Sequence, residues 1–148
     1  MDYKNILEKL PYSSPFLFVD ELLKINEKSA EGIYTFSEDS FFYKGHFKNN
    51  PVTPGVILTE CMAQIGVVCL GIFLLENSKE TSKNIKLALS SSEVDFYLPV
   101  FPGETVKVVS EKLFYRFNKL KCEVRMYSKE NKLICHGKIA GMIKNEPV

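Results

Sequence analysis

The chain has 148 residues with a formal net charge of +1 at pH 7, and 45% of its residues are hydrophobic. This composition indicates a globular protein and excludes an intrinsically disordered one, and the length suits one domain over 1–148 with a single core. The near-neutral charge gives no electrostatic reason to expect nucleic-acid binding.

Hydrophobic spacing predicts the elements of the first third of the chain. Apolar residues at i, i+3, i+4 and i+7 predict a short helix over 3–10, with Asp2 as its N-cap and Pro11 as its end. An apolar run then predicts a strand over 16–25. After a turn, alternating residues over 29–36 predict the hairpin partner of that strand.

The central third contains a long apolar helix over 55–76, which Pro54 starts, because proline suits the first turn of a helix. The segment is long and apolar enough to imitate a membrane span. Glu60 and Gln64 lie inside it, however, and no asymmetry of charge flanks it. These features favour a helix buried on all sides in a protein core, so no membrane span is expected.

The remaining chain predicts four strands, over 85–98, 105–117, 119–126 and 133–143. Apolar alternation changes phase within each of the first two, near 90–92 and between 108 and 113, so both are expected to contain an irregularity. The predicted fold class is α+β, with an antiparallel sheet of about six strands curled around one long central helix.

Four cysteines are present, and no two of them form a CxxC pair. We therefore expect no zinc or other metal site, and interpret them as small buried thiols in a reducing cytoplasm. They are Cys61, Cys69, Cys122 and Cys135.

Three positions in the central stretch could form a proton-transfer site beside a carbonyl group. Glu60 lies among apolar residues, so it either finds a partner or has a raised pKa and holds a proton, as a general acid must. His46 can act as a base near neutral pH. Gly55 opens a helix whose N–H groups can polarise a carbonyl oxygen. The alternatives are a solvent-facing glutamate and a histidine that only packs in a turn.

Other polar and aromatic residues have supporting or structural interpretations. Gln64 follows Glu60 by one helical turn and is expected to orient it, or else to satisfy buried backbone groups. His136 is expected to face outward as a bystander, and Asp20 to accept a structural hydrogen bond. The aromatic cluster over 41–43 is interpreted as core.

Residues 45–64, GHFKNNPVTPGVILTECMAQ, resemble the 3-hydroxyacyl-[acyl carrier protein] dehydratases of the FabZ type, which have the hot-dog fold. The family pattern, close to GHF-x-x-x-PV-x-PGV-x-x-x-E-x-MAQ, fits without a gap. Weaker agreement extends through LPYSSPFLFVD near the start and FYLPVFPGE further on, so the resemblance covers essentially the full length.

The resemblance implies a role for each matching residue. His46 would remove the C2 proton of a (3R)-3-hydroxyacyl thioester, and Glu60 would assist departure of the 3-hydroxyl group as water. The backbone N–H of Gly55 would bind the thioester carbonyl. The product would be a trans-2-enoyl thioester, with no metal or organic cofactor. Related dehydratase/isomerases carry aspartate at the position of Glu60, so isomerisation is not expected.

The resemblance also implies partners. The substrate would arrive on an acyl carrier protein. The histidine and the acid of one site come from different subunits in the family, which implies a homodimer and allows a hexamer of three dimers. The acyl chain would lie in an apolar tunnel along the dimer interface.

Departures from the family pattern lie outside the catalytic positions. Tyr12 and Ser13 replace the usual histidine and arginine, Lys48 and Asn49 replace the usual Pro-Gly, and the usual basic residues are missing from 95–98. The first and the last of these changes bear on recognition of the acidic carrier of fatty-acid synthesis, whereas the change at 48–49 is less informative. Two pathways therefore stay open: primary fatty-acid synthesis, and a specialised one with its own carrier, for example polyketide-like or aryl-polyene synthesis.

Two alternative functions stay open at this point. One is a hot-dog acyl thioesterase, which uses a carboxylate on the same helix but typically lacks this histidine motif. The other is a non-catalytic acyl-thioester binding protein, against which the presence of both His46 and Glu60 argues.

Overall fold

The computed structural model describes residues 3–77 and 84–146. The helical elements are α1 (Lys4–Glu8), the 3-10 helix η1 (Phe41–Lys44), α2 (Gly55–Ala63), the π-helical turn η2 (Gln64–Val68) and α3 (Cys69–Glu76). The strands are β1 (Glu21–Ile25), β2 (Ser29–Thr35), β3 (Asn84–Phe96), β4 (Thr105–Arg116), β5 (Lys119–Ser128) and β6 (Leu133–Glu146).

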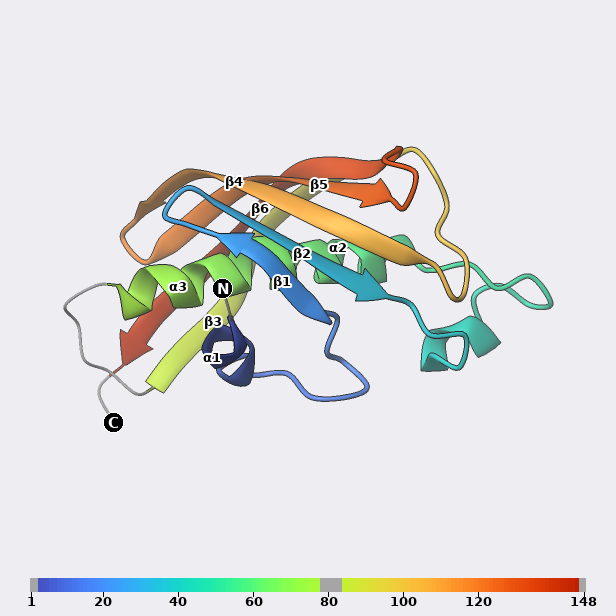
Figure 1. Cartoon of the computed structure of the whole chain (residues 1–148), viewed down its shortest axis with the longest axis horizontal. Coiled ribbons are helices and arrows are strands. Elements are labelled where there is room, and N and C mark those ends of the chain that lie inside the picture. The colour runs from blue at the N-terminus through green and yellow to red at the C-terminus, as the bar shows by residue number, and fades with distance from the viewer. Residues whose placement is uncertain (1–2, 78–83, 147–148) are drawn as a thin grey trace.

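The strands form a single sheet that wraps around the central helix. Its order is β1-β2-β4-β5-β6-β3, and every neighbouring pair is antiparallel. Figure 1 shows the sheet curling around the green helix, with the edge strands β1 and β3 on different sides of it. The six-stranded hot-dog architecture expected from the sequence is therefore confirmed.

The central helix runs without a break through α2, η2 and α3, from Gly55 to Glu76, as predicted. By length and composition it could cross a membrane, but 78% of its most apolar stretch is buried inside the chain, as in a core helix. The π-helical turn was not predicted. It packs against β2, β4, β5 and β6, so the wider turn lies where the sheet surrounds the helix most closely.

Both predicted strand irregularities are present. The pairing of β3 with β6 shifts register between Leu89 and Ser91, and that of β4 with β5 shifts between Lys112 and Phe114. Because side chains alternate with a period of two, each shift changes the parity of the residues that face the core. Leu87 and Val94 both pack against it across the first shift, and Val108 and Tyr115 across the second.

The strand predicted over 16–25 is wrong in its first half, because β1 begins only at Glu21. Phe18 and Val19 are buried, as their apolar character requires. Their segment, however, bonds to a helix side chain rather than to a neighbouring strand. The Phe18 N–H donates to Oε1 of Gln64 at 2.8 Å, and the Phe16 carbonyl accepts from its Nε2 at 3.1 Å.

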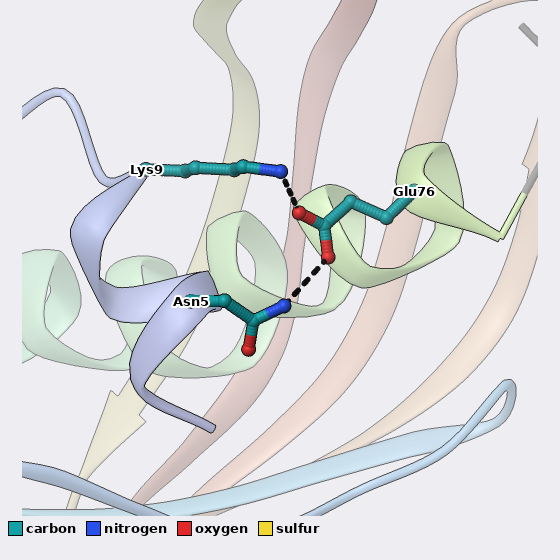
Figure 2. Close-up of polar contacts among 3 residues, drawn as sticks. All are labelled: Asn5, Lys9 and Glu76. Atoms are coloured by element: carbon teal, nitrogen blue, oxygen red, sulfur yellow. Dashed lines mark hydrogen bonds and ion pairs between the residues drawn. The ribbon is translucent and has the colours of Figure 1, made fainter. Parts of the chain in front are cut away.

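The first helix is shorter than predicted, and Asp2 lies outside the described residues. Tyr3 stands at the N-cap without a capping side-chain bond. Figure 2 shows how α1 is held against the end of α3: Lys9 forms an ion pair with Glu76, and Asn5 Nδ2 donates to the same carboxylate at 3.3 Å. Because this cluster is partly solvent-exposed, burial of Ile6 is expected to contribute more to docking.

The aromatic cluster over 41–43 is only partly core. Tyr43 is buried and its hydroxyl bonds to Thr53 Oγ1 at 2.5 Å, whereas Phe41 is 52% exposed. A 3-10 turn places consecutive residues on different faces, so these three rings cannot all point inward.

Two glycines of β6 offer a matched test of how closely β3 and β6 approach. A Cβ at Gly137 would overlap the carbonyl oxygen of Glu93 and lie 2.8 Å from Val94 Cα. At Gly141 it would meet only ordinary contacts, at 3.4 and 3.5 Å.

We expect Gly137→Ala to lower the free energy of unfolding by about 1–3 kcal/mol or more, because the backbone must shift. Gly141→Ala should change it by less than about 0.5 kcal/mol. Urea denaturation of both variants measures this, and equal losses would contradict the close approach.

Candidate active site

The buried amide of Gln64 holds Glu60 and the N-terminal segment together. Gln64 is completely buried, and its Nε2 donates to Glu60 Oε2 at 2.8 Å as well as to the Phe16 carbonyl. Its Oε1 accepts the Phe18 N–H. Both amide hydrogens therefore have acceptors, which fixes the orientation of the amide group. The expected orienting role of Gln64 agrees with this geometry, and the bonds to Phe16 and Phe18 also match the alternative of satisfying buried backbone.

Glu60 is half-buried on the first turns of the central helix. Burial raises the pKa of its carboxyl group above the ordinary value of 4.5, and the hydrogen bond from Gln64 lowers it by less. Desolvation penalises the charged form, so the carboxyl holds its proton to a higher pH than a solvated glutamate does. This is the property that a general acid needs.

A largely apolar cavity of about 190 Å³ lies beside Glu60. Its wall comes from the central helix, from β3 and β6, and from the segment that contains Tyr12 and Phe16. Burial and then the charge of Glu60 raise the pKa of Tyr12 to about 12, so its hydroxyl remains protonated. Sequence reasoning did not include Tyr12 in the site. The sequence signal that could have identified Tyr12 is its position, at which the family pattern has a histidine.

His46 is held by the loop that precedes the helix. Its Nδ1 lies 2.9 Å from the carbonyl oxygen of Val52, and its own carbonyl accepts the Val52 N–H at 2.9 Å. A carbonyl only accepts hydrogen bonds, so in the neutral ring Nδ1 carries the hydrogen and Nε2 has the free lone pair. Phe47 stacks on the ring with centroids 4.0 Å apart. The loop therefore presents one basic nitrogen in a fixed orientation.

Gly55 begins α2, where the first N–H groups have no acceptor within the helix. The ring of Phe96, on β3, lies against Gly55. A Cβ added at this glycine would be 3.2 to 3.5 Å from the ring atoms. The helix start thus combines backbone donors with an apolar wall. Such a place suits a polarised carbonyl attached to an apolar chain.

Among the described residues of the expected site, direct contact is shown for Glu60 and Gln64. Among the described residues that line the cavity at Glu60, His46 is absent. His136 lies on the outer face of the sheet, with Nε2 3.7 Å from Glu123, so its expected outward orientation is confirmed. Asp20 accepts the Thr35 N–H at 2.7 Å, as expected of a structural acceptor.

The four cysteines are buried free thiols in this structure, as expected. Across residues 3–77 and 84–146, no three side chains of the metal-ligating types His, Cys, Asp and Glu gather in one place.

Comparison with known proteins identifies close sequence relatives. Residues 10–143 match the family model described as a FabA-like domain. A relative from Caldicellulosiruptor saccharolyticus, named 3-hydroxyacyl-[acyl-carrier-protein] dehydratase FabZ, is 34% identical over 145 residues. The match covers 97% of this chain and 99% of the relative.

Solved structures with the same fold include proteins of two activities. The dehydratase heterocomplex ApeI:P of Xenorhabdus doucetiae superimposes with a TM-score of 0.78 at 15% identity, over 95% of this chain and 91% of that one. A hypothetical thioesterase with coenzyme A from Streptococcus pneumoniae has a TM-score of 0.61 at 10% identity, over 86% and 88%. At these identities the likeness shows the fold alone.

The raised pKa of Glu60 predicts a pH-dependent cost to stability. The pKa of this carboxyl group is higher in the folded state than in the unfolded state. Its contribution to the free energy of unfolding is therefore complete below the unfolded-state pKa, and it is lost as the pH rises through the folded-state pKa. Glu60→Gln cannot ionise. The free energy of unfolding of the variant relative to the wild type should therefore increase from pH 4 to pH 8. Urea denaturation across this range measures it, and a constant difference would contradict the shift.

Proposed function

The chain belongs to the FabA-like family, and on this premise we propose that it dehydrates (3R)-3-hydroxyacyl thioesters on acyl carrier protein to trans-2-enoyl thioesters. It is then a hydro-lyase of acyl synthesis. The observation that carries the proposal is Glu60, a carboxyl group with a raised pKa held by Gln64 at an apolar cavity. A protonated acid beside space for an acyl chain suits removal of a hydroxyl group as water.

The proposed roles account for each bond that changes. His46 Nε2 removes the C2 proton, and the C–H electrons form the C2=C3 double bond. The C3–O bond breaks, and the oxygen leaves as water with the proton of Glu60. The N–H of Gly55 stabilises the negative charge that develops on the thioester oxygen. Transfer of the proton from His46 back to Glu60 restores both groups for the next turnover.

We further propose that two copies of the chain complete each site. The edge strand β3 and the start of α2 expose apolar side chains, of which Val56 is 77% and Leu89 60% exposed. An unpaired strand edge with apolar side chains is a surface that a second chain can cover. Within such a homodimer, His46 of one copy would serve Glu60 of the other. Three dimers could then assemble into a hexamer.

The carrier protein is proposed to meet the chain in the cytoplasm, in fatty-acid synthesis or in a specialised acyl synthesis with a dedicated carrier. The segment Asp95-Phe96-Tyr97-Leu98 exposes three apolar or aromatic side chains and no basic one. An acidic carrier binds best to a positive surface, so this segment suits a carrier with an apolar contact region.

Replacement of either catalytic group tests the assignment. We expect His46→Ala and Glu60→Gln each to lower kcat for (3R)-3-hydroxyacyl thioesters by about 10²- to 10⁴-fold, the usual effect of losing a general base or acid. Formation of the enoyl thioester is followed by its absorbance. His136→Ala is the matched control, because this second histidine lies on the outer face of the sheet. Equal rates for the wild type and His46→Ala would refute the proposal.

The same assay separates the two alternative functions. Release of free thiol, detected with a thiol reagent, would indicate a thioesterase instead. Tight binding without turnover at any chain length would indicate a non-catalytic binding protein.

Mixing inactive variants tests whether the site is shared between copies. His46→Ala and Glu60→Gln subunits refolded together should form about half heterodimers, each with one intact site. Activity should therefore recover to roughly a quarter of the wild-type value. If both groups came from one chain, every site would lack one of them and no activity would return.

A further inference from the structure

The cavity beside Glu60 is lined mainly by apolar residues. Among its described lining residues, Glu60 and Tyr12 are the two polar side chains. The remaining wall is made by glycine and apolar residues, including Val67 and Val68 on the central helix and Leu87 on β3. A cavity with this division can hold an apolar chain whose polar, reacting end stays at the carboxyl group.

At Ile143, one of the lining residues, the sheet comes into direct contact with the helix. A Cβ added at Gly71 would overlap Cδ1 of Ile143, so this methyl group rests directly on the helix backbone. Ile143 is 1% exposed and also lines the cavity. Gly71 lies one turn beyond Val67, the lining residue nearest to it on that side of the helix. The contact of Ile143 with Gly71 therefore leaves no room for an acyl chain between these two residues, one turn beyond Val67.

The size of the cavity limits the chain that it can hold. An apolar cavity of about 150 Å³ holds the six carbons of benzene, which gives about 25 Å³ per carbon. The volume of about 190 Å³ then holds about seven or eight carbons. The length is a looser limit: Val68 lies eight residues after Glu60, or about 12 Å along a helix, and an extended chain that advances about 1.2 Å per bond covers this distance in about ten bonds. The volume therefore sets the limit.

We propose that the acyl tail enters the subunit that supplies Glu60, and that Ile143 against Gly71 limits the substrate to medium chains of about ten or eleven carbons. This inference rests on the proposed function. With C3 beside Glu60, carbons 1 to 3 lie outside the cavity and seven or eight further carbons fill it. Longer chains must displace the buried Ile143 or bend back toward the interface, so they bind less well.

The experiment measures chain-length profiles of turnover and of binding. The substrates are 3-hydroxyacyl thioesters of 4 to 16 carbons. Binding is measured by calorimetry with saturated acyl-pantetheine thioesters, which cannot be dehydrated. In the wild type, kcat/KM and affinity should rise by about fourfold per added methylene and fall beyond ten or eleven carbons.

Ile143→Ala removes the proposed end of the cavity. It should move both optima to longer chains by about two carbons, since three side-chain carbons are lost. Ile134→Ala is the matched control: Ile134 is equally buried on the same strand, but it is not among the described lining residues. The control should lose similar stability and keep the wild-type optimum.

Gly141→Ala tests the same cavity in the opposite direction. The added methyl would lie 3.4 Å from Val67 Cγ1 and 3.5 Å from the Ala88 carbonyl oxygen, between two lining residues, without a clash. We expect a several-fold loss on ten-carbon substrates and little change on four-carbon substrates, because only the longer tail reaches this point.

The outcomes distinguish this inference from the function on which it rests. Dehydration with a flat chain-length profile, or equal shifts in Ile143→Ala and Ile134→Ala, would overturn the cavity assignment and leave the dehydratase standing. Length-limited binding without any dehydration would refute the function and retain the cavity as a medium-chain acyl site.

Discussion

The side chain of Gln64 is the point on which the rest of the site depends. This one amide is completely buried, and it bonds to the Phe18 N–H, the Phe16 carbonyl and the Glu60 carboxylate. A buried amide with an unmet hydrogen bond costs free energy, so each of the three partners is held where it is needed. The central helix, the N-terminal segment and the acid are thereby tied to each other.

The core helix carries Glu60, the proposed acid, within a surface that is otherwise largely apolar. Its sides are covered by the curled sheet, which leaves Glu60 half-buried near the start of the helix, beside the cavity. Desolvation there raises the pKa of the carboxyl group, so the same packing that stabilises the fold also keeps this carboxyl protonated to a higher pH. The π-helical turn follows directly, where the helix meets β2, β4, β5 and β6.

The proposed base and the proposed acid are positioned by independent parts of the chain. His46 depends on hydrogen bonds to Val52 within its own loop, whereas Glu60 depends on Gln64 and the helix. Each arrangement is complete inside one chain, although His46 does not line the described cavity at Glu60. Two rigid half-sites on one subunit suit an assembly in which neighbouring copies supply complementary groups, as we propose.

The sequence by itself determined the central helix and the strand irregularities, and it supplied the motif on which the proposed site residues rest. These features are local: a proline at the first turn, a change of alternation phase, and a motif within twenty residues. Tertiary structure alone decided that the apolar run over 16–25 is only half strand, because its hydrogen bonds go to Gln64, far along the chain. It also decided the cavity, since Tyr12, Glu60 and Ile143 meet only after the sheet has curled around the helix. Periodicity reports which face of an element is apolar, but not which distant side chain will stand opposite to it.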